Sequence, residues 1–298
     1  MTENRKTGHL LTEKINPRTV DLDKRSPLEV VELILEEDST IIQAIEKEKH
    51  NIADAVELVT DKIKLGGRLF FIGAGTSGRL GVIEAAECPP TFGTDPDLIQ
   101  GFIAGGREAI WQSIEGAEDS RTQGQELLAE AGLTKYDVVV GIAASATTPF
   151  VEGGLQYAKN KGSSSVLVTC NTVESKIADV TIELLVGPEV VVGSSRMKAG
   201  TVTKMVLNMI TTASMVQLGK TYGNLMVDVQ PKSAKLRDRA KRIVMYIAEI
   251  SEEKADELLI ESGWDVKTSI VMEKKGLSLE DSRELLGKHN GFLREALK

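Results

Sequence analysis

Cysteine, histidine and aromatic residues are scarce in this 298-residue chain. It contains two cysteines, Cys88 and Cys170, three histidines, His9, His50 and His289, and only 4% aromatic residues. Two separated thiols make neither a disulfide framework nor a CxxC zinc motif, and three scattered histidines predict no metal site. We therefore expect a core built mainly from aliphatic side chains and no bound metal.

Long apolar runs and an excess of positive charge are also missing. Residues 1–11 lack the apolar core of a signal peptide, and no run approaches the roughly 20 apolar residues of a membrane span. The formal net charge is −8, whereas nucleic acids select clustered Lys and Arg. We therefore expect a cytoplasmic protein without a membrane or nucleic-acid partner. One small phosphate is still a suitable ligand, because a few amides, hydroxyls and cations can hold it.

Short apolar runs alternate with helical patterns in the middle of the chain. The runs predict strands at Arg68–Ile72, Leu98–Ala104, Asp137–Ile142, Ser165–Thr169 and Val180–Leu185. Helical patterns lie at Ser77–Ala86, Ile110–Ala131, Pro149–Lys161, Glu174–Ala178 and Met197–Gly219. This alternation predicts an α/β fold: a doubly wound, mostly parallel five-stranded sheet with helices on both faces.

Helical patterns alone are present at both ends of the chain. Ser26-Pro27 has the composition of a helix start, and a longer pattern runs from Ser39 to Leu65. Towards the C-terminus, short segments are separated by Ser, Gly or Asp, at 235–249, 252–262, 265–275 and 278–287. We predict an α/β domain with N-terminal helices over residues 1–234 and a small helical domain over residues 235–298.

Three loops carry glycine, hydroxyl and basic residues at the predicted carboxyl ends of strands, where open α/β sheets bind ligands. The first loop, Gly73–Arg79, offers backbone amides and donors from Gly75, Thr76, Ser77 and Arg79. Its glycine spacing also fits a dinucleotide fingerprint, but the acidic residue that should follow the second strand is missing. An anion site therefore explains this loop better than a dinucleotide site.

The second and third loops carry further hydroxyl groups. The second loop, Ala143–Pro149, places Ser145, Thr147 and Thr148 before a helix, which suits phosphate binding and helix capping equally well. The third loop, Gly193–Thr201, adds clustered basic residues that capping does not explain. Its candidate ligands are Ser194, Ser195, Arg196 and Lys198.

Acidic residues lie close to these loops. Glu84 and Glu87 are three residues apart and share one face of the helix after the first loop. Cys88-Pro89-Pro90 is expected to end that helix and to direct Glu87 into a cleft. Glu118 and its acidic neighbours lie near the expected start of another helix, where the helix dipole favours negative charge without any catalytic role.

Several long motifs resemble the N-acetylmuramic acid 6-phosphate etherase family. In chain order they are Gly73–Gly81, Glu87–Gly93, Ile103–Gly106, Glu115–Arg121, Val139–Ser145, Val186–Val190, Gly193–Thr201 and Gly223–Asp228. The resemblance extends from Asn16-Pro17 to His289–Phe292 and covers nearly the whole chain. That family is related to sugar isomerase (SIS) proteins and to a glucokinase regulatory protein.

This resemblance implies an SIS-type fold and the elimination of D-lactate from N-acetylmuramic acid 6-phosphate, giving N-acetylglucosamine 6-phosphate in amino-sugar recycling. By motif position it implies that Glu87 is the general acid for lactate departure and that Glu118 is the base at carbon 2 of the opened sugar. Such chemistry needs two carboxylates in different settings and no cofactor, and we expect Glu87 in the less polar one. The resemblance also implies a homodimer, with the sugar site completed across the subunit boundary.

The second loop departs from the family pattern. The family reads Ala-Ala-Ser-Gly-Arg-Thr-Pro, whereas Ala146-Thr147 replace Gly-Arg in this chain. These changes remove the freedom of glycine to adopt positive φ and a guanidinium that can clamp phosphate. Two alternatives therefore stay open: an SIS-type sugar-phosphate isomerase, and a sugar-phosphate-sensing regulator without catalysis.

Overall fold

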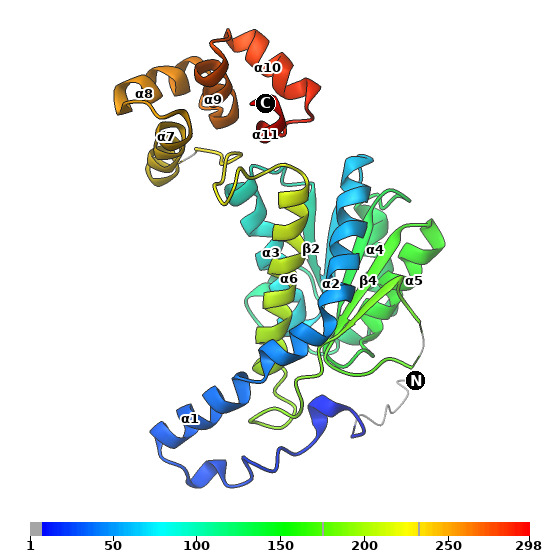
Figure 1. Cartoon of the computed structure of the whole chain (residues 1–298). Coiled ribbons are helices and arrows are strands. Elements are labelled where there is room, and N and C mark those ends of the chain that lie inside the picture. Colours follow the sequence, from blue (N-terminus) through cyan, green and yellow to red (C-terminus); the bar gives the residue numbers. More distant parts are fainter. Residues whose placement is uncertain (1–7, 175, 232) are drawn as a thin grey trace. The chain divides into compact units, whose positions relative to one another are not determined.

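The computed structural model describes residues 8–174, 176–231 and 233–298, which divide into two compact units (Figure 1). Unit 1 comprises Met1–Ala86 and Asp97–Thr211, and unit 2 comprises Glu87–Pro96 and Thr212–Lys298. The predicted division after residue 234 does not coincide with this partition. Two boundaries of the observed partition lie within helices, one in α3 (Gly75–Phe92) and one in α6 (Lys198–Gln217).

The sheet of unit 1 has five parallel strands, which confirms the predicted α/β class. They are β1 (Leu69–Gly73), β2 (Ile99–Ile103), β3 (Val138–Ile142), β4 (Ser164–Thr169) and β5 (Val180–Glu183), in the order β2-β1-β3-β4-β5. The chain adds β2 on one side of β1 and the remaining strands on the other. This reversal is a topological switch point, so the carboxyl ends of β1 and β3 border the crevice in which such sheets bind ligands.

Helices cover both faces of this sheet (Figure 1). α4 (Arg121–Glu130) and α5 (Pro149–Lys161) cover the face that carries Phe70 and Ile72, where Phe150 is buried in the same apolar cluster. α3 covers the opposite face, because Gly81 lies directly against Phe71. α2 (Ile41–Lys64) and α6 lie on that second face as well.

Two predicted helices of unit 1 are wrong. Residues 110–131 do not form one helix but the 3-10 turns η3 (Arg107–Ile110) and η4 (Ala117–Asp119), followed by α4. Gly116 takes a left-handed φ of 73° before η4, and a right-handed helix cannot continue through that conformation. Of the segment 174–178, the described residues 174 and 176–178 are not helical.

The expected end of α3 at Cys88-Pro89-Pro90 is also wrong. Both prolines lie inside the helix, which continues to Phe92. Proline removes a helical N–H donor, but its fixed φ is compatible with a helix, so one further turn can form. The helix ends at Gly93, which takes a φ of 63° and donates its N–H to the carbonyl of Pro89.

The N-terminal part of unit 1 consists of short turns and two helices. α1 (Pro27–Asp38) begins as predicted after Ser26, whose side chain forms a capping box with Glu29. The segment before it contains the 3-10 turns η1 (Leu11–Glu13) and η2 (Leu22–Lys24). Figure 1 shows α1 extending away from the layered body of unit 1.

Unit 2 contains a bundle of short helices that confirms the predicted C-terminal pattern. They are α7 (Ala234–Ala248), α8 (Glu252–Glu261), α9 (Val266–Lys275), α10 (Leu279–Lys288) and α11 (Leu293–Ala296). The last helix has four residues, too few for a periodic pattern to predict it. Val244, Leu259 and Ile270 form the centre of the bundle core. Among the described residues of both units, no helix has the length and apolarity required to cross a membrane.

Candidate active site

The first loop turns sharply from β1 into α3. A Cβ atom on Gly78 would lie 2.6 Å from the carbonyl oxygen of Gly73, so the backbone of the loop can close only around glycine. Gly75 starts the helix with a left-handed φ of 54°. Thr76 and Ser77 follow in the first turn and are half-buried. The first amides of a helix have no helical acceptor, so this turn presents N–H and hydroxyl donors to an anion.

A cavity of ≈ 250 Å³ lies beside the first loop. It is bordered by Gly75 and Arg79 on one side and by the segment 109–118 on the other, so it brings Glu118 next to the helix start. Arg79 donates to the carbonyls of Ile110 and Gln112, each at 3.1 Å. The guanidinium therefore holds the segment that leads to Glu118, whose own side chain is exposed on η4.

The two acids of α3 have different surroundings. Glu84 is buried, and its carboxylate accepts hydrogen bonds from Asn208 and Thr211 on α6. Glu87, one turn further along, is exposed and belongs to unit 2. The less polar setting expected for Glu87 is therefore not formed by its immediate neighbours in one copy of the chain.

The second loop contains a strained residue. Ala146, at the position where the family pattern has glycine, takes a φ of 63°. Ser145 Oγ accepts from the backbone N–H and the hydroxyl of Thr147, each at 3.3 Å. Thr148 is the N-cap of α5, yet its side chain makes no capping hydrogen bond. The sequence left two functions open for these hydroxyls, phosphate binding and helix capping. Thr148 does not cap the helix with its side chain.

The third loop differs from the first two, because a carboxylate of the chain itself binds the N–H groups at the start of the following helix, α6. Glu189 is fully buried and accepts from the backbone N–H groups of Lys198 at 3.0 Å and Ala199 at 2.9 Å. Burial raises the pKa of Glu189, although these two hydrogen bonds act in the opposite direction. The first amides of α6 are therefore not available to an external phosphate.

Lys198, expected as a phosphate ligand, points into unit 1. It is 2% exposed, and its ammonium group forms an ion pair with Glu37 at the end of α1. Burial tends to raise the pKa of Glu37, but hydrogen bonds from Lys198 and Asn16 and the charges of Lys198 and Arg18 outweigh it and lower the pKa. Ser194 and Ser195 are half-buried and Arg196 is exposed, so these three residues have accessible side chains.

The structure brings most of the expected residues to one edge of the sheet. The first and second loops follow the paired strands β1 and β3. The side chain of Thr76 lies 3.4 Å from where a Cβ on Gly200 would be, so the first and third loops adjoin. Glu118 shares the cavity of the first loop, whereas Glu87 lies in the other unit. The sequence did not predict the structural roles of Glu189 and Glu37. Glu189 binds backbone N–H groups, and Glu37 pairs with a residue far along the chain, so neither contact leaves a sequence motif.

Among residues 8–174, 176–231 and 233–298, no group of three His, Cys, Asp or Glu side chains is placed to hold a metal ion.

One family model, many relatives and several solved structures resemble this chain. The family described as glucokinase regulatory protein N-terminal SIS domain matches residues 51–159. N-acetylmuramic acid 6-phosphate etherase of Trichodesmium erythraeum is 50% identical over 98% of this chain and 95% of its own length. The etherase of Clostridioides difficile is 48% identical over 97% and 96%. The sugar isomerase domain of an RpiR transcription factor from Sphaerobacter thermophilus aligns with a TM-score of 0.42 at 17% identity, over 63% of this chain and 94% of its own.

Proposed function

Because the chain belongs to the N-acetylmuramic acid 6-phosphate etherase family, we propose that it cleaves the D-lactyl ether of this substrate. The products are D-lactate and N-acetylglucosamine 6-phosphate. The observation that carries this proposal is the cavity that Glu118 shares with the first loop. It places a carboxylate, able to take a proton, beside a helix start able to hold an anion.

The phosphate is proposed to bind at the first and second loops. The starts of α3 and α5 supply N–H groups, and hydroxyls come from Thr76, Ser77, Ser145, Thr147 and Thr148. Ser194, Ser195 and Arg196 adjoin this edge and are proposed to complete the polar wall around the sugar. Lys198 is not included, because its charge is neutralised inside unit 1.

The proposed reaction is an elimination followed by addition of water. With the sugar opened to its aldehyde, Glu118 takes the proton from carbon 2, which the adjacent aldehyde acidifies. Glu87 donates a proton to the ether oxygen on carbon 3, and D-lactate leaves with the electrons of the C–O bond. Water then adds to carbon 3 of the unsaturated aldehyde, Glu87 taking one of its protons, and carbon 2 regains a proton from Glu118. The balance is one water consumed and two hydroxyl groups formed.

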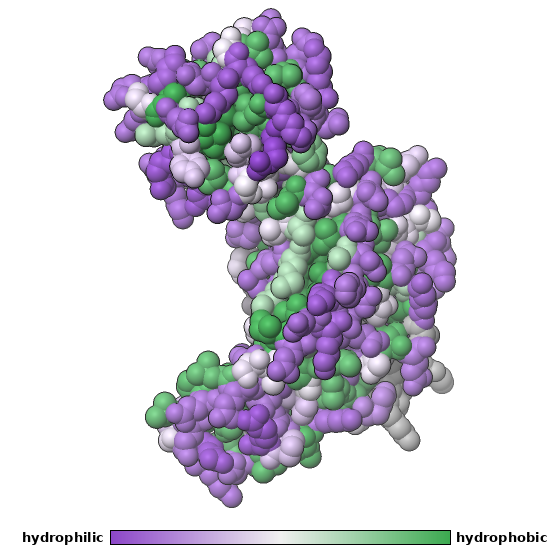
Figure 2. All heavy atoms as spheres, viewed as in Figure 1, coloured by the Kyte–Doolittle hydropathy of each residue, from purple (hydrophilic) through white to green (hydrophobic). Residues whose placement is uncertain are grey.

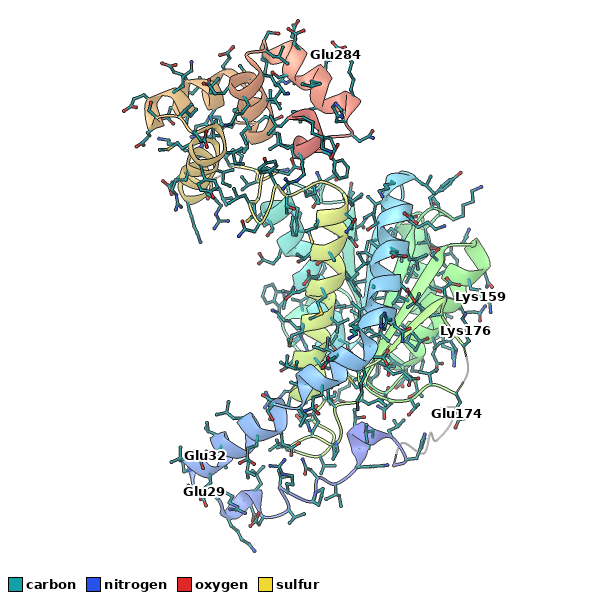
Figure 3. The ribbon with its side chains drawn as sticks, viewed as in Figure 1. Glu29, Glu32, Lys159, Glu174, Lys176 and Glu284 are labelled. Carbon is teal, nitrogen blue, oxygen red and sulfur yellow. The ribbon has the colours of Figure 1, made fainter. Side chains whose placement is uncertain are left out.

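A second copy of the chain is proposed to complete the site. Apolar side chains are left in solvent along one face of α1, where Leu28 is 66%, Val31 52% and Leu35 64% exposed. Figure 2 shows hydrophobic side chains gathered over this helix, and Figure 3 shows the acids Glu29 and Glu32 on it. A contiguous apolar face on a projecting helix is typical of an interface between subunits. A cytoplasmic location stays a prediction.

The lactate assay tests the proposed activity. Incubation with N-acetylmuramic acid 6-phosphate should release D-lactate and N-acetylglucosamine 6-phosphate in equal amounts. An isomerase would convert an aldose phosphate into a ketose phosphate without lactate, and a regulator would bind without turnover. The absence of lactate at high protein concentration would overturn the proposal.

Mixing two inactive variants tests the proposed dimer and the origin of the acids. We expect E87Q and E118Q, each alone, to release lactate at least about 100-fold more slowly than the wild type. If one site takes its two acids from different subunits, the mixed dimer contains one intact site, and activity returns after the subunits exchange. Light scattering of the wild type should give the mass of a dimer, and Leu35→Asp should shift it to a monomer. A fully active monomer would contradict the proposed assembly.

A further inference from the structure

We propose that Asn171 is a positioning residue, through which the N-terminal segment holds the second loop in the shape that receives the sugar phosphate. The inference rests on the proposed function, because it assigns the second loop to phosphate binding. Asn171 lies two residues after the end of β4 and is 2% exposed. It touches none of the proposed catalytic acids, so its role is indirect.

The side-chain amide of Asn171 joins two distant parts of unit 1. Its Nδ2 donates to the carbonyl of Ala144 at 2.7 Å and to the hydroxyl of Thr12 at 3.1 Å. Its Oδ1 accepts from the backbone N–H of Leu11. A backbone N–H can only donate, so this last bond fixes which end of the amide faces Ala144. Both amide hydrogens and the amide oxygen are therefore engaged.

The carbonyl that Asn171 holds is the anchor of the second loop. It also accepts from Cys170 N at 3.1 Å and Thr169 Oγ1 at 3.3 Å, so three donors from the end of β4 converge on it. Two residues later comes Ala146, whose left-handed backbone is disfavoured for a residue with a Cβ. Such a conformation persists where the surroundings fix it. Of these three donor residues, Asn171 is the one whose side chain also binds the N-terminal segment, at Leu11 and Thr12.

The N-terminal segment, residues 11–19, makes further hydrogen bonds to the chain near the third loop. Thr19 donates to the carbonyl of Val190 at 2.9 Å, and Asn16 donates to that of Pro188 at 3.4 Å. Both acceptors lie just before the third loop. Thr12, Asn16 and Thr19 are all buried, although polar residues in a terminal segment are usually exposed. The segment thus braces the carboxyl edge, and Asn171 is its connection to the second loop.

Asn171→Ala tests this role, with Asn51→Ala as the matched control. Asn51 lies on α2, where its amide donates to Glu48 at 2.8 Å. The measurements are KM and kcat for N-acetylmuramic acid 6-phosphate, and the Kd of inorganic phosphate by calorimetry. We expect N171A to raise KM and the phosphate Kd by a similar factor of about ten, with kcat changed much less. A factor of ten is about the net contribution of one hydrogen bond, and Asn171 makes one side-chain bond to the second loop. The control should leave all three unchanged.

Ala146→Gly separates positioning from a general loss of stability. Glycine adopts the left-handed conformation without strain, so the loop should depend less on its tether. The rise in phosphate Kd caused by N171A should therefore be clearly smaller in the A146G background. If N171A fails to fold, Thr12→Val is the second variant, because it removes one of the two partners of the amide in the N-terminal segment and keeps the bond to Ala144. It should raise the phosphate Kd less, in the same direction.

The outcomes for the two proposals are distinct. Unchanged phosphate Kd and KM in N171A and T12V would overturn the positioning role, as would equal effects in both backgrounds at residue 146. A wild-type chain that binds no phosphate would overturn it too. A wild-type chain that binds phosphate but releases no lactate would overturn the proposed function alone, because the calorimetric comparison would still stand.

Discussion

The two ends of the sheet in unit 1 are built in opposite ways. At the amino end, the buried carboxylate of Asp137 accepts from Arg68 and Thr134, through both their backbone N–H groups and their side chains. The guanidinium of Arg68 also donates to the carbonyls of Ala131 and Gly132, at 3.0 and 2.8 Å. Asp137 and Arg68 each have several partners, so this polar cluster is satisfied within the chain and joins the amino ends of β1 and β3.

The carboxyl end of the sheet carries polar side chains without a structural role and one strained backbone position. Thr148 does not cap its helix, Glu118 is exposed beside the first loop, and Ala146 holds a left-handed backbone. The left-handed backbone of Ala146 lowers stability, and the start of α5 has no side-chain cap that would compete with a ligand. The difference teaches that the amino end is stabilised by a closed polar cluster, whereas the carboxyl end carries the loops of the proposed site. Substitutions at the two ends should therefore affect different measurements.

The largest expected effect is at the carboxyl end. E118Q should lower kcat for lactate release by about 10²–10⁴-fold, the usual contribution of a general base. Its free energy of unfolding should change by less than about 0.5 kcal/mol, because the side chain is exposed. Glu130→Gln on α4, also exposed, is the control and should leave both quantities unchanged. If E118Q lowered the free energy of unfolding as much as a substitution of a buried residue does, the contrast between the two ends of the sheet would be wrong.

The second expected effect is at the amino end. Asp137→Ala leaves Arg68 with a partly buried, unpaired charge, and we expect a loss of about 3 kcal/mol in the free energy of unfolding. The kcat per folded molecule should be unchanged. Chemical denaturation and the lactate assay check the two quantities, and Asp54→Ala on the exposed face of α2 serves as the control. Loss of turnover in the folded variant would show that the two ends are coupled.

The same carboxylate should make stability depend on pH. Burial tends to raise the pKa of Asp137, but hydrogen bonds from Arg68 and Thr134 outweigh it, so the pKa lies below the ordinary 3.8. A lowered pKa means that the unfolded chain binds the proton more readily. This contribution to stability is present above pH 3.8 and is lost as the pH falls through the folded-state pKa. Denaturation below about pH 4 should show a shallower slope in D137A than in the wild type; equal slopes would contradict the assignment.

The smallest expected effect is a gain at the carboxyl end. Ala146→Gly removes a left-handed strain of about 1–2 kcal/mol but adds freedom to the unfolded chain, so unfolding should become harder by roughly 0.5–1 kcal/mol. Ala129→Gly within α4 is the matched control and should lower stability by about 1 kcal/mol. If both glycines destabilise the protein, Ala146 is not strained and the contrast between the two ends is weaker.

The sequence predicted the elements of the sheet better than the details of the site. The central strands contain short runs of apolar residues, as at Leu69–Gly73 and Val138–Ile142, and such runs can be recognised without knowledge of distant contacts. The left-handed Gly116 and the prolines of α3 were misjudged, because the same residues occur both within and at the ends of helices. Residue type alone does not decide between these local geometries.

The positions of buried polar groups could not be predicted for another reason. Lys198 has the composition of a phosphate ligand, yet it pairs with Glu37, 161 positions earlier in the chain. Glu189 and Asn171 bind mainly backbone groups, which every residue carries and no pattern marks. The loops were recognised from their glycines and hydroxyls, but which side chains face outward depends on the folded chain.

The two thiols described earlier make the protein convenient for optical distance measurements. Cys170 is fully buried, and burial raises its pKa to about 12, so almost no reactive thiolate is present near neutral pH. Cys88 is only 2% exposed. Dye-maleimides should therefore label cysteines introduced at the exposed Leu65 and Ile260 while both native thiols stay in place. Such a donor–acceptor pair, one dye in each unit, would follow the separation of the units as the sugar phosphate is added.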